Sequence, residues 1–291
     1  MTVIETKKLT KTYGSARGIT ELDLAVNEGD FFGFIGPNGA GKSTTIRTLL
    51  GLIFPTSGTA SIFGKDIISD KNEILRDIGY MPSEANFYSG MRVRDIISLS
   101  AGMRKKDCSE EAKRLCERLD LDCSKRVDEL SLGNRKKASI VCALQHKPKL
   151  CILDEPTSGL DPLMQREFFS ILRERHEEGA TIFLSSHILS EIQKNCTRAA
   201  IIKEGRLIAL DSVENLSKTS AKRVTLHGVN AVPEGISVRS AEVSEDGVTF
   251  LYGGDIKALL SAVNAMPITD MTITEPGLDE IFMHFYEKGG K

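Results

Sequence analysis

The residues with the clearest chemical potential form a glycine-rich loop, Gly36-Pro37-Asn38-Gly39-Ala40-Gly41-Lys42-Ser43. The loop follows an apolar strand pattern at residues 31–35 and precedes a helix pattern at residues 42–50. In this order of strand, loop and helix, main-chain N–H groups converge at the positive end of a helix, where phosphate oxygens bind. The sequence therefore predicts a cradle for the phosphates of a nucleoside triphosphate.

Three side chains at the end of this loop have separate expected roles. Lys42 is expected to reach the β- and γ-phosphates, the Ser43 hydroxyl to coordinate Mg²⁺, and Thr44 to support the phosphate contacts. A glycine-rich turn without a ligand is the alternative. The flanking strand and helix favour the phosphate-binding interpretation.

Two carboxylates, Asp154 and Glu155, follow the apolar segment at residues 150–153. Ligands collect at the carboxyl ends of strands in parallel sheets. We expect Asp154 to hold Mg²⁺ and Glu155 to activate the attacking water. An isolated Asp-Glu pair would be a solvated strand end, but a pair that accompanies a phosphate-binding loop is more consistent with catalysis.

The segments around these residues alternate between strand and helix patterns, which predicts an α/β fold with buried parallel strands. Expected strands occupy residues 3–9, 19–26, 31–35, 78–81, 150–153, 181–184, 198–202 and 206–209. Expected helices occupy residues 42–50, 163–177 and 188–194. Three further helices, at residues 92–103, 109–119 and 134–145, form a predicted helical insertion at about 84–148.

The pattern changes after about residue 218. Short strands are expected at residues 224–226, 238–243, 248–252 and 272–274, and helices at residues 256–265 and 278–286. The sequence therefore predicts a first domain at residues 1–218 and a small α+β domain at residues 219–291.

The overall composition argues against several classes of protein. The formal net charge is −2, so no general attraction to nucleic acid is expected. No apolar run approaches the ~18 residues needed to cross a bilayer, and the first residues lack a signal-peptide core. The six cysteines form no Cys-x-x-Cys pair and are expected to be free thiols in a reducing cytoplasm.

The order of these motifs resembles that of the nucleotide-binding subunits of ATP-binding cassette (ABC) transporters over roughly residues 3–215. Leu130-Ser131-Leu132-Gly133-Asn134 occupies the place of the family signature Leu-Ser-Gly-Gly-Gln. In the family this segment contacts the γ-phosphate bound to a partner's glycine-rich loop, which implies that Ser131 and Gly133 bind ATP in trans. Without the resemblance, Ser131 is predicted only as the cap of a helix.

Three further segments fall in the family order. Ser158-Gly159-Leu160-Asp161 resembles the D-loop, which meets the opposite subunit, and His187 resembles the switch histidine that contacts the γ-phosphate. Tyr13 resembles the aromatic residue on which adenine stacks, although taken alone it is a packed strand residue. The resemblance implies ATP and Mg²⁺ as ligands, Glu155 as the base, and His187 and Lys42 as charge-stabilising groups.

Two positions depart from the family pattern. Family members have a glutamine near Mg²⁺ after the strand at residues 78–81, but this chain has Ser83 followed by Glu84. Either Ser83 contacts the metal through water, or Glu84 contributes, or the contact is weak. In the signature, Leu132 and Asn134 replace glycine and glutamine, and the bulky Leu132 is expected to slow closure of a dimer.

The resemblance implies an ATP hydrolase that works as a head-to-tail dimer, with a second copy or a related cassette. Separate transmembrane permease subunits are expected to dock near residues 84–103. The single cassette and the segment at residues 275–282 most resemble bacterial ABC-2-type export ATPases for drugs, antibiotics and ions. This implies a cytoplasmic protein on the inner face of the membrane. The alternatives are a soluble ABC ATPase not coupled to a membrane and an ATP-binding module with little turnover.

Overall fold

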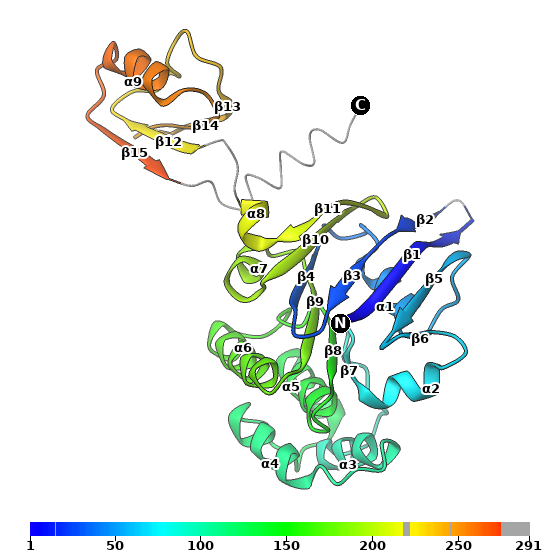
Figure 1. Cartoon of the computed structure of the whole chain (residues 1–291). Coiled ribbons are helices and arrows are strands. Elements are labelled where there is room, and N and C mark those ends of the chain that lie inside the picture. The colour runs from blue at the N-terminus through cyan, green and yellow to red at the C-terminus, as the bar shows by residue number, and fades with distance from the viewer. Residues whose placement is uncertain (15, 218–221, 245, 275–291) are drawn as a thin grey trace. The chain divides into compact units, whose positions relative to one another are not determined.

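The computed structural model describes residues 1–14, 16–217, 222–244 and 246–274. The chain divides into two compact units, Met1–Ser212 and Val213–Lys291 (Figure 1). This division lies a few residues before the boundary that the sequence predicts at residue 218. Within the described part of the chain, no helix combines the length and the apolar character that crossing a membrane requires.

A six-stranded sheet forms the centre of the first unit, with the strand order β11-β10-β4-β9-β8-β7. β11 pairs antiparallel with β10, and the other pairings are parallel. Every residue of β4, β8 and β9 is buried, as expected for strands covered on both faces. The prediction of buried parallel strands is therefore confirmed. The strands are β4 (Phe31–Ile35), β7 (Ile78–Met81), β8 (Leu150–Asp154), β9 (Thr181–Ser186), β10 (Arg198–Lys203) and β11 (Arg206–Ser212).

The carboxyl ends of four parallel strands meet at one edge of this sheet. β4 leads into the glycine-rich loop and α1 (Lys42–Leu49), and β7 leads to Ser83. β8 ends at Asp154, which lies beside Ser185 of β9 in the register of the sheet, and β9 precedes His187. The topology therefore gathers the predicted chemical residues at a single edge.

A second, antiparallel sheet has the order β2-β1-β5-β6, with β3 also paired to β1. The sequence predicts one strand at residues 19–26, but two form there. The Asp23 Oδ1 atom accepts a hydrogen bond from the Lys8 main-chain N–H at 2.7 Å and so takes the place of a strand partner. β5 has no predicted counterpart because its first three residues are polar or glycine and exposed. The strands are β1 (Thr2–Tyr13), β2 (Ala16–Leu22), β3 (Ala25–Asn27), β5 (Ser57–Ile62) and β6 (Lys65–Asp66).

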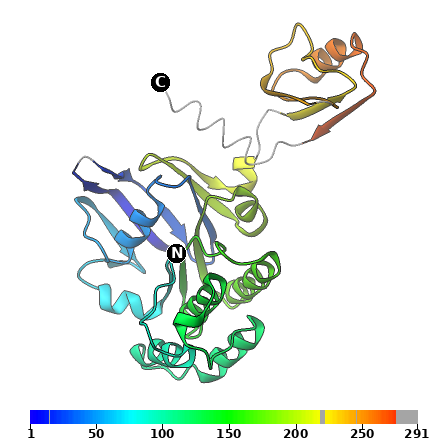
Figure 2. The ribbon, with the colours of Figure 1, turned by 180° about the vertical axis from the view of Figure 1, so that it is seen from behind.

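The helices follow the predicted order. α3 (Val93–Met103), α4 (Ser109–Arg118) and α5 (Leu132–Leu144) form the helical insertion, with α3 and α4 at the end of the first unit away from β1 and β2 (Figure 2). α5 begins two residues earlier than predicted because the Ser131 side chain caps it. The remaining helices of this unit are α2 (Lys71–Ile74), η1 (Leu75–Asp77), η2 (Val127–Glu129), α6 (Pro162–Glu177) and α7 (Leu189–Asn195).

Ion pairs attach α4 of the helical insertion to α6. Arg118 contacts Glu167 and Glu174, each at 2.5 Å, and Arg114 contacts Glu174 at 3.0 Å. Burial raises the pKa of Glu174, but its hydrogen bonds with Arg118 and Arg114 more than offset burial and hold the pKa below its ordinary value. Ion pairs therefore connect α4 of the helical insertion to α6, the helix that follows the D-loop.

The second unit is a small α+β fold. Its antiparallel sheet has the order β13-β14-β12-β15, and Leu259 and Val263 of α9 pack in one apolar cluster with strand residues such as Phe250. The predicted helix at residues 278–286 lies outside the described residues. The elements are α8 (Val213–Ser217), β12 (Lys222–His227), β13 (Arg239–Ser244), β14 (Gly247–Tyr252), α9 (Ile256–Asn264) and β15 (Asp270–Thr274).

Candidate active site

The glycine-rich loop has a backbone path that only glycine permits at two positions. A Cβ atom at Gly36 would lie 2.6 Å from the Ile202 carbonyl oxygen, and one at Gly41 would lie 2.9 Å from Ile19 Cγ2. Gly41 also has a φ of 108°, and it gives α1 no side-chain cap. The first N–H groups of α1 are therefore presented to a ligand, at the end of the helix that attracts anions.

The Lys42 ammonium lies at the centre of this loop and is buried. Its Nζ atom donates to the carbonyl oxygens of Gly36 at 2.5 Å and Pro37 at 3.2 Å. It also forms an ion pair with Glu155 Oε1 at 3.0 Å, although these two atoms are not aligned for a hydrogen bond. The predicted phosphate-binding lysine and the predicted base are thus in direct contact.

A cavity of about 320 Å³ contains most of the predicted nucleotide-binding residues. Ser83 contributes to its wall together with the glycine-rich loop, which brings the residue in place of the family glutamine into the site. Glu84 is exposed and is not part of this wall. The lining residues are Pro37, Asn38, Gly39, Gly41, Lys42, Ser43, Thr44, Ser83 and Glu155.

A serine of the neighbouring strand holds the Asp154 carboxylate and the Glu155 main chain at the end of β8. Ser185 Oγ donates to Asp154 Oδ1 at 2.6 Å and accepts from the Glu155 main-chain N–H at 3.1 Å. Asp154 and Ser185 are buried. Sequence reasoning misses the contact of Ser185 with Asp154. The signal that identifies this contact is the pairing of β8 with β9, which aligns the two residues.

Glu155 also contacts the predicted switch histidine. Its Oε2 atom lies 2.8 Å from His187 Nδ1, and His187 is exposed. The Glu155 carboxylate therefore lies between Lys42 and His187, which are the groups expected to stabilise a γ-phosphate. Sequence reasoning also misses Lys136, whose side chain reaches the Glu155 main chain.

The signature segment lies outside the cavity that holds Lys42 and Glu155. Ser131 caps α5 by accepting a hydrogen bond from the Asn134 main-chain N–H at 3.3 Å, which is its expected local role. The Leu132 side chain is 62% exposed. It lies beside the D-loop, because a Cβ atom built on Gly159 would be 3.1 Å from Leu132 Cδ2. A Cβ atom on Gly133 would lie 3.0 Å from the Gly159 carbonyl oxygen, so these two segments are adjacent.

Tyr13 is at the end of β1 and does not line the cavity. Its side chain is 43% exposed, and Lys11 Nζ lies 5.3 Å from the centre of its ring. An exposed ring of this kind has the form that base stacking needs. The contact with adenine stays a prediction.

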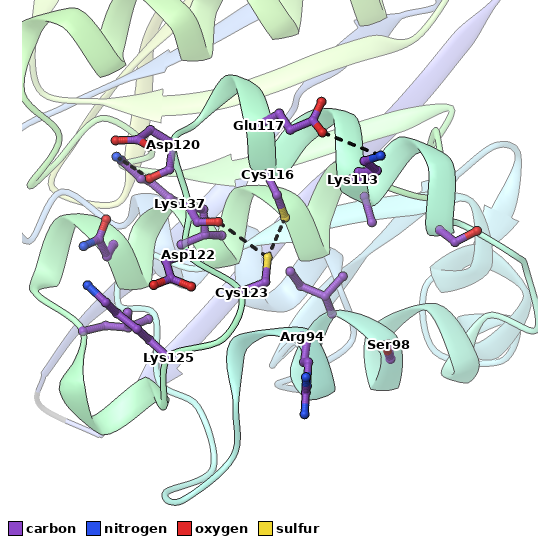
Figure 3. Close-up of a pocket in the computed structure, with 16 residues that line it drawn as sticks. Arg94, Ser98, Lys113, Cys116, Glu117, Asp120, Asp122, Cys123, Lys125 and Lys137 are labelled. Carbon is purple, nitrogen blue, oxygen red and sulfur yellow. Dashed lines mark hydrogen bonds and ion pairs between the residues drawn. The ribbon is translucent and has the colours of Figure 1, made fainter.

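A larger cavity, of about 870 Å³, lies in the helical insertion (Figure 3). The thiols of Cys116 and Cys123 point toward each other there, with their sulfur atoms 3.2 Å apart. Lysine, arginine, aspartate and glutamate side chains all contribute to its wall, and the glycine-rich loop, Asp154, Glu155 and His187 do not. We therefore assign the chemistry to the smaller cavity.

Comparison with known proteins identifies the class to which this fold and site belong. The sequence model of a family described as "ABC transporter" matches residues 19–158. A model described as "AAA domain, putative AbiEii toxin, Type IV TA system" matches residues 126–192, which include Asp154 and Glu155. The bacitracin transport ATP-binding protein BcrA of Bacillus licheniformis is 37% identical to this chain, over 97% of the chain and 96% of the relative. BcrA of Enterococcus faecalis is 32% identical, over 99% and 97%.

A solved structure of the ATP-binding subunit of an ABC transporter is 30% identical, with a TM-score of 0.69 over 74% of this chain and 91% of that chain. The chain therefore belongs to the family of ABC transporter ATP-binding proteins. It is an ATP-binding and ATP-hydrolysing subunit, and the predicted cassette fold is confirmed.

Proposed function

We propose that Glu155 is the catalytic base for ATP hydrolysis and that Lys42 and His187 stabilise the charge on the γ-phosphate. The observation that carries this assignment is the position of the Glu155 carboxylate, 3.0 Å from Lys42 Nζ and 2.8 Å from His187 Nδ1. A γ-phosphate that enters the cavity competes with this carboxylate for Lys42. Exchange of the Lys42 ammonium from Glu155 to phosphate frees Glu155 to accept a proton from water.

The proposed reaction is a direct transfer of the γ-phosphoryl group to water. A water oxygen attacks the γ-phosphorus while Glu155 takes its proton, and the bond from the γ-phosphorus to the β–γ bridging oxygen breaks. The bridging oxygen keeps the electron pair, and ADP and inorganic phosphate are the products. Lys42 and the N–H groups at the start of α1 bind the charge that develops on the phosphate oxygens.

The residues at this edge fit a magnesium ion. Asp154, Ser43 and Ser83 offer only oxygen atoms, which are the ligands that Mg²⁺ prefers. The described residues contain no group of three or more histidine, cysteine, aspartate or glutamate side chains that could hold a metal on their own. Such a site relies on the phosphates of the nucleotide for its other ligands. When bound, Mg²⁺ would neutralise phosphate charge. Ser185 holds one oxygen of Asp154 through its hydroxyl.

The second half of the site is proposed to come from another cassette. Ser131 and Gly133 do not line the cavity that holds Lys42 in their own chain. A head-to-tail dimer brings these groups of one subunit to the nucleotide of the other, so that ATP binds between two surfaces. ATP binding then closes the dimer, and hydrolysis opens it.

We further propose that this motion drives export through separate permease subunits at the inner face of the membrane. The support is the similarity to two bacitracin transport ATP-binding proteins over nearly the whole chain. Permease subunits are expected to contact residues 84–103, which include the start of the helical insertion. The test is purification of the chain from native membranes: a co-purifying integral membrane protein supports the proposal, and recovery without one contradicts it.

The catalytic assignment is tested by phosphate release from Mg-ATP with the wild-type chain and Glu155→Gln. The variant keeps the shape of the side chain but cannot take a proton, so kcat is expected to fall by about 100-fold or more. Size-exclusion chromatography with Mg-ATP should show that Glu155→Gln accumulates as a dimer. Turnover of Glu155→Gln at the wild-type rate would show that another group is the base.

A further inference from the structure

Lys136 is a buried lysine in the helix that begins at the signature segment. Its side chain is only 1% exposed. Its Nζ atom donates to the main-chain carbonyl oxygen of Glu155 at 3.0 Å. Burial lowers the pKa of Lys136, while the charges of Asp154 and Glu155 oppose this shift. Burying an ammonium group costs free energy, so its position needs a compensating interaction.

The Glu155 main chain has an uncommon conformation. Its φ is 48°, in the left-handed region that residues with a side chain seldom adopt. The Glu155 N–H donates to Ser185 of β9, and its carbonyl oxygen accepts from Lys136 of α5. Both polar atoms of this residue's main chain are thus bonded to side chains of other elements, which is how a surrounding structure maintains such a conformation.

We propose that Lys136 is a positioning residue, which ties the signature helix to the main chain of Glu155 and keeps the Glu155 carboxylate directed at the γ-phosphate. This inference rests on the proposed role of Glu155 as the base. Ser131 caps the same helix on which Lys136 lies. In the proposed dimer, Ser131 contacts the partner's ATP, whereas Glu155 acts on the ATP of its own chain. The Lys136 contact therefore links the two nucleotide sites of the dimer.

The test compares Lys136→Met, which removes the donor, with Lys136→Gln, which keeps an N–H donor. For Lys136→Met we expect kcat for ATP hydrolysis to fall by about 10- to 100-fold, the size of effect that a misplaced catalytic group produces. The dissociation constant for a fluorescent ATP analogue should change less than about twofold, because the glycine-rich loop is untouched. Lys136→Gln should recover part of kcat. The matched control is Lys137→Met, whose Nζ atom is 3.5 Å from the Asp120 carbonyl oxygen.

Three results would overturn the inference. One is a kcat of Lys136→Met within twofold of the wild-type value. Another is an equal loss of kcat and ATP affinity with a lower melting temperature, which would mean that Lys136 only supports the fold. The third is a Lys136→Gln variant that folds and binds ATP but is as slow as Lys136→Met. Glu155→Gln is measured in the same assay, so an error in assigning the base is distinguished from an error in assigning Lys136.

Discussion

The helices α1 and α5 both begin at a proposed phosphate contact, but their N-terminal ends differ. α1 follows Gly41, which provides no side-chain hydrogen bond to the helix. α5 follows Ser131, whose hydroxyl already accepts the Asn134 main-chain N–H at 3.3 Å. The start of α1 also contains the buried Lys42, whereas Ser131 and Leu132 are exposed. One end is open to an anion, and the other is satisfied by its own cap.

This difference indicates that the glycine-rich loop and the signature segment have different roles in the proposed nucleotide site. The glycine-rich loop can bind phosphate within a single chain. The signature must share or exchange its cap to contact a partner's phosphate, and such a cap is worth about 1 kcal/mol. Loss of this cap subtracts that free energy from the proposed contact in trans, which would help the proposed dimer to open again after hydrolysis.

Removing the Lys42 ammonium should weaken phosphate binding at the start of α1, and we expect it to have the largest effect on activity. Lys42→Ala loses a charge-assisted phosphate contact and leaves the Glu155 carboxylate without its cation. We expect ATP affinity to fall by about 100-fold, with hydrolysis lost. Equilibrium binding of a fluorescent ATP analogue measures the change, and Lys147→Ala, at an exposed lysine, is the control. ATP affinity within twofold of wild type would contradict the role of Lys42.

The Ser131→Asp variant should separate the two roles of Ser131, which are capping α5 and contacting a partner's phosphate. Aspartate is as good a cap as serine, so the melting temperature should stay near the wild-type value. Its carboxylate would repel the partner's γ-phosphate, and turnover should fall by about 10- to 100-fold, because apposed like charges oppose closure of the dimer. ATP binding to the monomer should be unchanged. Wild-type turnover of Ser131→Asp would exclude the proposed contact in trans.

Leu132→Gly makes the start of α5 more like the family signature, which has glycine at this position. The exposed leucine occupies space beside Gly159, and its removal lets a partner's backbone and phosphate approach more closely. We expect turnover to rise by roughly two- to fivefold, with a loss of stability of about 0.5–1 kcal/mol from the added glycine. Steady-state phosphate release is the measurement. No gain in turnover would show that Leu132 does not slow dimer closure.

The region just after the C-terminal end of α5 contains His146, and we expect this residue to make the stability of the fold depend on pH. His146 is buried, with Nε2 3.1 Å from the Ile78 carbonyl oxygen. Burial, followed by the charges of Arg104 and Lys106, lowers its pKa to about 4 despite the Ile78 contact and nearby Asp77. The unfolded chain, with an ordinary pKa near ~6.5, binds this proton first, so the free energy of unfolding should decrease as pH falls from about 6.5 to about 4.

The magnitude of this pH effect is on the order of 2–3 kcal/mol. His146→Gln should flatten the decrease in that window, without changing turnover at neutral pH. Urea unfolding of the first unit at several pH values provides the measurement, and His227→Gln in the second unit is the control. An unchanged pH dependence in His146→Gln would mean that other groups cause it.

The glycine-rich loop and the Asp-Glu pair were predictable because each is contiguous and follows a recognisable strand. Ser185 and Lys136 hydrogen-bond the Glu155 main chain from β9 and α5, about 30 and 19 residues away in the chain. No local pattern marks a serine or a lysine for such a contact, since the pairing of β8 with β9 and the packing of α5 create it. β5 and β6 have no predicted counterparts for a related reason: β5 shows little apolar alternation and pairs with β1, which lies far away in the chain, and the two-residue β6 pairs only with β5.

The order of strands in the central sheet also affects synthesis of the protein. β4 precedes the glycine-rich loop, yet its two neighbours, β9 and β10, come about 150 residues later, as the pairing of Phe31 with Ile182 illustrates. At roughly 5–20 residues per second, a ribosome needs about 10–30 seconds to make that stretch. During this interval the most apolar strand of the nucleotide site leaves the ribosome without its hydrogen-bonding partners. A nascent chain interrupted before Thr181 would therefore expose β4 to aggregation or to chaperones.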